Sequence, residues 1–153
     1  MTTEARRTTE QSLLTELADE LLRFSKRRHG AIDGTELETS AFKLLWVLSD
    51  DEPRTLRELA DALELDLSTI NRQVNAALRA GLLERFAVPG SPSKPVRPSA
   101  EGHRLYQHDM AVHADLLRSV LAEMGADGAR NLIRSLGAFN DAYERRAPHR
   151  HRG

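Results

Sequence analysis

The sequence predicts a mainly α-helical protein with one small β-hairpin. Apolar residues recur at helical spacing through six segments of the chain. A single pair of short extended stretches is separated by a proline- and glycine-rich run at 89–93. The 153 residues, 40% of them hydrophobic, are enough for one domain with a core. The expected order is therefore four helices, a hairpin and two further helices.

Composition excludes several classes of protein. The chain has no cysteine, which excludes disulfides and thiolate zinc sites. No apolar run approaches the roughly 20 residues of a membrane span, and residues 1–10 are too polar for a signal peptide, so we expect a cytoplasmic protein without membrane contact. Neither a Ser-His-Asp set, nor paired catalytic carboxylates, nor a phosphate-cradling glycine loop is present, so we expect no enzyme and no cofactor.

The first two helices are predicted from their start and stop signals. Thr8-x-x-Gln11 has the pattern of a capping box, and leucines at helical spacing continue to about His29-Gly30. A second helix is predicted over 39–49, with Phe42 and Trp46 among its apolar residues. The run 50–53, which ends in proline, stops it.

The next segment predicts two short helices and a hairpin. Thr55-x-x-Glu58 is a second capping box, and a tight turn at 64–65 leads to a fourth helix. Asp66 or Ser68 caps that helix, which runs to about residue 80, before Gly81. Residues 82–88 and 94–97 read as strands that join across the turn at 89–93, and the flanking prolines favour a sheet edge.

The remaining chain predicts a helix from Ser99 to Gly125 and a last helix from about Asp127 until Pro148 stops it. The apolar stripes of helices 8–29 and 103–147 have no other domain to cover them, so we expect a homodimer. The predicted organisation is a DNA-binding domain at 31–99, a helical dimerisation domain formed by 1–30 and 100–147, and a disordered tail at 148–153.

The assignment to DNA rests on the fourth helix. Leu67, Ile70, Val74, Ala77 and Leu78 fall on one stripe, which predicts a polar face opposite it. Arginine can pair with guanine and asparagine with adenine, while hydroxyls can bond phosphates. An ordinary solvated face would mix glutamate with lysine, whereas this face holds no acid. The predicted DNA-binding residues of the helix are Ser68, Thr69, Asn71, Arg72, Asn75 and Arg79.

Charge distribution supports the same interpretation, although the net charge is only −1. Residues 31–65 contain nine acids and three bases, while residues 66–104 contain six bases and three acids. A basic segment can equally be a solvated face. The hairpin that follows the polar helix adds Lys94 and Arg97 to the predicted DNA-binding set, and a helix-turn-helix followed by a hairpin is a winged helix.

Over nearly its whole length the chain resembles the MarR family of bacterial winged helix-turn-helix regulators. The resemblance rests on Thr55-Leu-Arg-Glu-Leu-Ala, Leu65-Asp-Leu-Ser-Thr-Ile-Asn-Arg, Ala80-Gly-Leu-Leu-Glu-Arg and Ser99-Ala-Glu-Gly. It implies a homodimer whose recognition helices enter successive major grooves of a pseudo-palindromic operator. It also implies a transcriptional repressor that a small aromatic or anionic effector releases from double-stranded DNA.

The resemblance further implies an effector pocket, for which Phe24, Arg28, Trp46 and His113 are candidates. For Phe24 and Trp46, a core or interface role is the competing interpretation. Metal binding is not expected, because His103, His108 and His113 are spaced five residues apart and do not share a helix face.

One departure from the family keeps a second function open. MarR-family wings usually carry an Asp-x-Arg motif whose arginine enters the minor groove, but residues 90–94 read Gly-Ser-Pro-Ser-Lys. Lys94 or Arg97 are the candidates to replace that arginine. The alternative is an interaction protein with a winged-helix fold that has lost operator binding, and the acid-free face around Arg72 argues against it.

Overall fold

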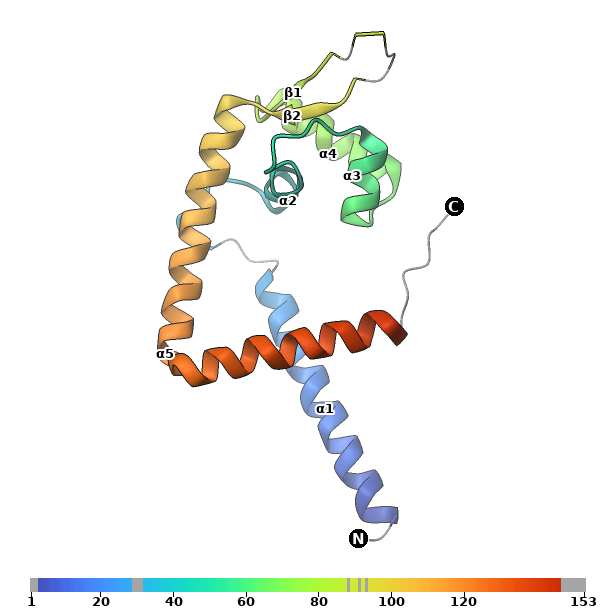
Figure 1. The fold of residues 1–153 in the computed structure, drawn as a ribbon, viewed down its shortest axis with the longest axis vertical. Helices are drawn as coiled ribbons and strands as arrows, with labels where there is room; N and C mark the ends of the chain where they lie inside the picture. Colours follow the sequence, from blue (N-terminus) through green and yellow to red (C-terminus); the bar gives the residue numbers. More distant parts are fainter. Residues whose placement is uncertain (1–2, 29–31, 88, 91, 93, 147–153) are drawn as a thin grey trace. The chain divides into compact units, whose positions relative to one another are not determined.

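The structure is a computed structural model that describes residues 3–28, 32–87, 89–90, 92 and 94–146. The chain forms two compact units, Met1–Asp109 and Met110–Gly153, which are described separately below. The predicted fold class is confirmed, because a small antiparallel hairpin lies within an otherwise helical order (Figure 1). The elements are α1 (Thr3–Arg28), α2 (Thr39–Val47), α3 (Leu56–Leu63), α4 (Leu67–Arg79), β1 (Leu83–Arg85), β2 (Val96–Pro98) and α5 (Ala100–Arg146).

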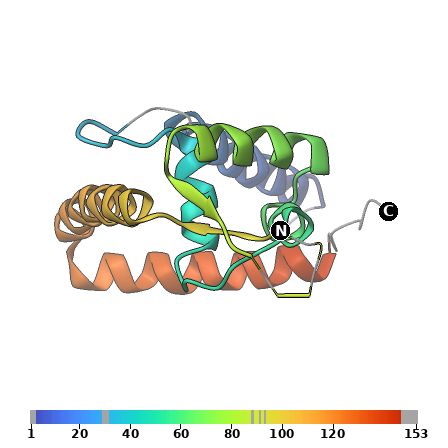
Figure 2. The ribbon, with the colours of Figure 1, turned by 90° about the horizontal axis from the view of Figure 1, so that it is seen from above.

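The core of the first unit lies between α2, α3, α4 and the hairpin. Each of these three helices contributes completely buried side chains, and Val96 of β2 closes the cluster from the hairpin side. Figure 2 shows α4 running beside the hairpin, as their contacts require. The buried cluster consists of Leu44, Leu45, Leu48, Leu59, Ala60, Ile70, Val74, Ala77, Leu82, Leu83 and Val96.

The helix-turn-helix is set by local signals that the sequence analysis identified. The Thr55 hydroxyl accepts from the Glu58 N–H at 3.3 Å, and the Glu58 carboxylate accepts from the Thr55 N–H at 2.7 Å, which confirms the capping box. Glu64 then adopts a left-handed conformation with φ 54°, and the Leu65 N–H donates to the Ala60 carbonyl. This turn ends α3 and places α4 across it.

The hairpin strands are shorter than predicted. Strands were expected over 82–88 and 94–97, but β1 and β2 have three residues each, with Glu84 opposite Arg97. Among the described residues beyond β1, the Phe86 N–H continues the ladder to the Pro95 carbonyl at 2.7 Å. Proline has no N–H to donate, so the prolines of the wing limit pairing. On the other side, Arg54 forms an antiparallel bridge with Val96.

The first turn of α5 packs directly against the start of β1. Ser99 Oγ accepts from the Gly102 N–H at 3.0 Å and donates to the Gly81 carbonyl at 2.5 Å. A Cβ at position 102 would clash with the Leu82 carbonyl oxygen and crowd the Leu45 side chain. Only glycine fits here, so the Ser-x-x-Gly pattern is required by a close backbone approach.

One buried carboxylate ties α5 to the segment before α2. Asp109 is 1% exposed, and its two oxygens accept from the backbone N–H groups of Glu36 and Leu37, each at 2.9 Å. Next to it, His108 Nε2 lies 2.9 Å from the Gly34 carbonyl. Asp109 therefore supplies the partners of two backbone donors that no helix or strand satisfies.

Two predicted helix boundaries differ from the structure, and the predicted break at Gly125 is confirmed. Helix α1 begins at Thr3, so Thr8 is not its cap, because Glu4, Ala5 and the two following arginines already favour helix. Helix α2 ends at Val47 rather than residue 49. The predicted break at Gly125 is present as a residue with φ 72° and ψ 163° inside α5, where the chain turns sharply (Figure 1).

Outside the core of the first unit, α1 and the second unit expose large apolar side chains. Leu13, Leu22 and Phe24 of α1 are all at least 60% exposed, as are Leu117 and Ile133 of the second unit. Among the described residues, no helical stretch combines the length and the apolar character that a membrane span requires. A surface of this kind is typical of a chain that is covered by another protein surface.

Substitution of Asp109 by asparagine is expected to destabilise the first unit. The new amide group presents a donor to one of the two backbone N–H groups, so one charge-assisted hydrogen bond is lost, which costs ~1.5–3 kcal/mol. Urea unfolding measures this change as a lower midpoint. The control is Asp61→Asn, an exposed position of α3, for which we expect a change within about 0.5 kcal/mol. Equal midpoints for the two variants would contradict the assigned role of Asp109.

Candidate nucleic-acid interface

The two faces of α4 are as different in the structure as the sequence predicts. Ile70, Val74 and Ala77 are buried against the core. The side chains on the other side are exposed at Ser68, Asn71, Arg72 and Arg79, and half-buried at Thr69 and Asn75. The fourth helix therefore brings all six predicted residues onto one continuous outer surface.

Asp66 organises the start of this surface. Its carboxylate accepts from the Thr69 N–H at 2.8 Å, from the Ser68 hydroxyl at 2.5 Å and from the Thr69 hydroxyl at 2.7 Å. These bonds, the one from the Ser68 hydroxyl above all, hold the pKa of Asp66 well below its usual range. Asp66 is thus the cap of α4, and Ser68 is not. Both hydroxyl protons point at Asp66, so either hydroxyl must turn before it can donate to a phosphate.

Asn71 and Asn75 form a pair one turn apart. The Asn75 amide donates to the Asn71 side-chain oxygen at 3.2 Å. This bond does not use the Asn71 amide nitrogen or the Asn75 side-chain oxygen. The two side chains together offer a donor and an acceptor, the combination that recognises an adenine edge in the major groove.

Arg72 and Arg79 are the cations of this surface. Several arginines of the described residues form ion pairs, including Arg54 with Asp50 and Arg104 with Glu101. No ion pair within the described part of the chain involves Arg72 or Arg79. The charges of Arg72 and Arg79 are therefore available to a negatively charged partner.

The two predicted wing residues differ from each other. Lys94 is exposed and forms no ion pair with a described residue. Arg97 Nε donates to the Glu84 carboxylate at 2.6 Å, and its guanidinium lies over the Phe86 ring, 5.0 Å from the centroid. Glu84 therefore neutralises Arg97, which must leave this pair before it can contact a phosphate.

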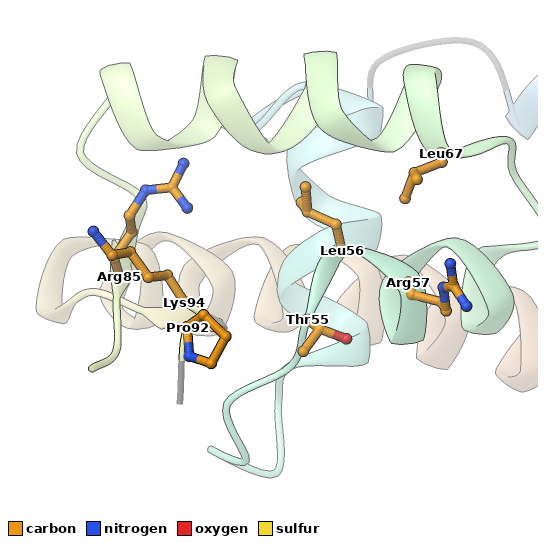
Figure 3. Close-up of a pocket in the computed structure, with 7 residues that line it drawn as sticks. All are labelled: Thr55, Leu56, Arg57, Leu67, Arg85, Pro92 and Lys94. Atoms are coloured by element: carbon orange, nitrogen blue, oxygen red, sulfur yellow. The ribbon is translucent and has the colours of Figure 1, made fainter. Parts of the chain in front are cut away.

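A pocket between α3, α4 and the wing adds two cations that the sequence analysis missed. In Figure 3, Arg85 and Lys94 lie together on one side of this pocket and Arg57 lies on the other. Arg57 falls in the acid-rich part of the sequence and Arg85 follows Glu84, so neither stands out in the charge pattern. The lining residues are Thr55, Leu56, Arg57, Leu67, Arg85, Pro92 and Lys94.

Comparison with known proteins agrees with this geometry. Residues 37–84 match the family model described as winged helix-turn-helix DNA-binding. This match spans α2, α3, α4 and the start of the hairpin, the elements that build the surface described above. No curated protein sequence matches the chain.

Solved structures extend the likeness beyond the matched segment. The PcaV transcriptional regulator of Streptomyces coelicolor is 23% identical with a TM-score of 0.67, over 85% of this chain and 96% of PcaV. FabT of Streptococcus pneumoniae, solved in complex with DNA, is 13% identical with a TM-score of 0.66, over 90% and 97%. ZitR of Lactococcus lactis, a zinc-responsive MarR family member, is 10% identical with a TM-score of 0.61, over 87% and 98%.

The chain has the MarR fold. The family resemblance that the sequence indicated is thereby confirmed at the level of the fold. The MarR resemblance also implied an effector pocket. Phe24 and Trp46 are 63% and 59% exposed, the side chain of Arg28 lies outside the described residues, and His113 belongs to the second unit. The effector pocket therefore stays a prediction.

Two histidines of α5, His103 and His108, contact the segments that flank α2. His103 Nε2 lies 2.6 Å from the Asp51 carboxylate, at the end of α2. His108 meets the Gly34 carbonyl before α2, and its Nε2 lies 3.7 Å from a Glu36 carboxylate oxygen. These two side chains join α5 to the segments on either side of α2.

The cap of the recognition helix is expected to make stability depend on pH. Because the folded-state pKa of Asp66 is below its ordinary value of 3.8, ionised Asp66 stabilises the fold fully above that value, and the stabilisation is lost as the pH falls below it. The difference in unfolding temperature between Asp66→Ala and the unmodified chain should therefore be nearly constant from pH 7 to about pH 4 and should shrink as the pH is lowered further below 3.8.

Asp66→Asn is the matched control, because its amide oxygen can cap the helix but does not titrate. Its unfolding midpoint should stay at a nearly constant distance from that of Asp66→Ala over the same pH range. A gap between the unmodified chain and Asp66→Ala that did not change with pH would contradict the role of the charged cap.

Proposed function

We propose that the protein is a cytoplasmic transcriptional regulator that binds a pseudo-palindromic operator as a homodimer. It acts as a repressor, and a small aromatic or anionic effector releases it from the DNA. The outer face of α4 is the observation that carries this proposal. That face has no acid along 67–79, and it combines a pair of asparagines with two arginines that form no ion pair with a described residue.

Each part of the face has a role that follows from its chemistry. Arg72 and Asn75 lie opposite the buried stripe of α4, so they are the residues proposed to contact base edges. Lys94 lies on the wing, where a long flexible cation suits a phosphate. Relatives of the same fold support DNA as the partner, since FabT was solved in complex with DNA.

The exposed apolar residues of α1 and the second unit support the homodimer. A face with several leucines at 43–62% exposure is stable in water when a second copy covers it. Release by an effector is supported by PcaV, which has also been solved with its natural ligand. The binding of an effector by this chain rests on that likeness and on the pocket candidates named above.

The dimer is tested by sedimentation of the full chain at low micromolar concentration. We expect a single species of about twice 17.1 kDa. A control is the same measurement on Leu13→Lys, which places a charge in the exposed apolar stripe of α1 and should shift the mass towards the monomer. A stable monomer of the unmodified chain would overturn the homodimer.

The roles of helix and wing are tested by salt titrations of DNA binding, after selection of the preferred sequence from genomic fragments. Loss of one bidentate base contact costs ~1–3 kcal/mol, so Arg72→Ala should weaken operator binding about 10- to 100-fold and binding to scrambled DNA much less. Lys94→Ala should weaken both by a similar factor and reduce the salt slope by about one unit.

Opposite results would reassign these residues. If Lys94→Ala removed the preference for the operator and Arg72→Ala changed only the salt slope, the wing would read the sequence. If the selection gave no preferred sequence and neither variant changed DNA binding, the interaction protein with a winged-helix fold would be the better description.

A further inference from the structure

The pocket between α3, α4 and the wing carries positive charge that no described residue neutralises. Arg57, Arg85 and Lys94 all line it, and no acid does (Figure 3). None of the three forms an ion pair within the described part of the chain. Unneutralised cations that face one pocket repel each other, so an anion bound between them is stabilised.

The acids next to Arg57 and Arg85 in the sequence, Glu58 and Glu84, form hydrogen bonds with other residues. Glu58 follows Arg57, but its carboxylate caps α3 through the N–H and hydroxyl of Thr55, at 2.7 and 2.8 Å. Glu84 precedes Arg85, but its carboxylate is paired with Arg97 at 2.6 Å. Both carboxylates thus have partners other than Arg57 and Arg85, and neither arginine forms an ion pair with a described residue.

The pocket also has an apolar floor. Figure 3 shows Leu56 between the cations of the two sides, and Leu67, at the start of α4, is 50% exposed. The Thr55 hydroxyl donates to Glu58, so it adds no free donor to the pocket. The pocket therefore has cations on two sides and leucines between them. The sugar–phosphate backbone of DNA is complementary to this arrangement, because its negatively charged phosphates alternate with deoxyribose rings.

We propose that this pocket is a DNA backbone site, in which Arg57 and Arg85 contact phosphates on the two sides of a deoxyribose that packs on Leu56. The site rests on the proposed function and adds a second attachment beside the outer face of α4. This site adds Arg57 of α3 and Arg85 of β1 to the proposed DNA interface, and Lys94 lies beside them in the lining of the pocket. Such contacts fix how the recognition helix is oriented but carry no sequence information.

Arg57→Gln and Arg85→Gln test the site, each measured by fluorescence anisotropy on the selected operator and on a scrambled duplex. Each variant should weaken both duplexes by the same factor, about fivefold at 0.15 M salt, and reduce the salt slope by about 0.9. Arg104→Gln is the matched control, because it removes a charge from the same unit that is already paired with Glu101. It should leave affinity and slope unchanged.

Duplexes with single neutral methylphosphonate linkages locate the contact. At one position per half-site, the neutral linkage should weaken binding of the unmodified chain but not weaken binding of Arg57→Gln any further. At a neighbouring position, the neutral linkage should weaken binding of the unmodified chain but not weaken binding of Arg85→Gln any further. If both variants keep the full salt slope and no position shows this coupling, the pocket is not a backbone site.

Failure of the pocket and failure of the proposed function give different results. If the pocket variants bind like the unmodified chain while Arg72→Ala still loses the operator preference, only the backbone site is wrong. If Arg72→Ala and both pocket variants all bind both duplexes like the unmodified chain, the proposed function is wrong as well. Circular dichroism of each variant establishes that it is folded.

Discussion

The close approach of Gly102 to the Leu82 carbonyl is the constraint on which the packing of the first unit depends. At this point the end of α4, the start of β1 and the first turn of α5 meet, and their backbones lie too close together for any side chain at position 102. The Leu82 N–H donates to the Ala77 carbonyl of α4, and the Leu82 carbonyl accepts from the Ser99 N–H before α5. The backbone of a single residue, Leu82, thus links α4, the hairpin and the start of α5.

About two turns further along α5, Asp109 provides a second attachment, to the segment that leads into α2. The first attachment lies at Leu82, before the hairpin, and the second at Glu36 and Leu37, before α2. Helix α5 therefore contacts the segments that precede both elements. His103 and His108 reinforce the two attachments from the same helix. Residues 100–109 therefore belong to the first unit, although they begin a helix that continues into the second unit.

Local signals in the sequence predicted the fold well, and long-range packing limited the rest. The Thr55 capping box, the cap at Asp66 and the break at Gly125 depend on a few neighbouring residues, so the chain alone reveals them. The hydrogen-bond partners of Asp109 are more than 70 residues away in sequence, and no local pattern shows them. Within the candidate site, the outer face of α4 follows from helical periodicity, whereas the Arg97–Glu84 pair and the pocket around Arg57 depend on which strands and helices meet.

A net charge of −1 is compatible with DNA binding because of where the charges are neutralised. In the first unit, Asp50, Glu84 and Glu101 are each bound to an arginine, and Glu58 and Asp66 are held by backbone and hydroxyl donors at helix starts. The negative charges of these five carboxylates are thus offset by partners within the first unit. The arginines of α4 and of the pocket form no ion pair with a described residue, so positive charge gathers on that surface although the net charge of the chain is −1. What selects a polyanion is the arrangement of unpaired charges on one surface, and this arrangement arises only when α3, α4 and the hairpin pack together.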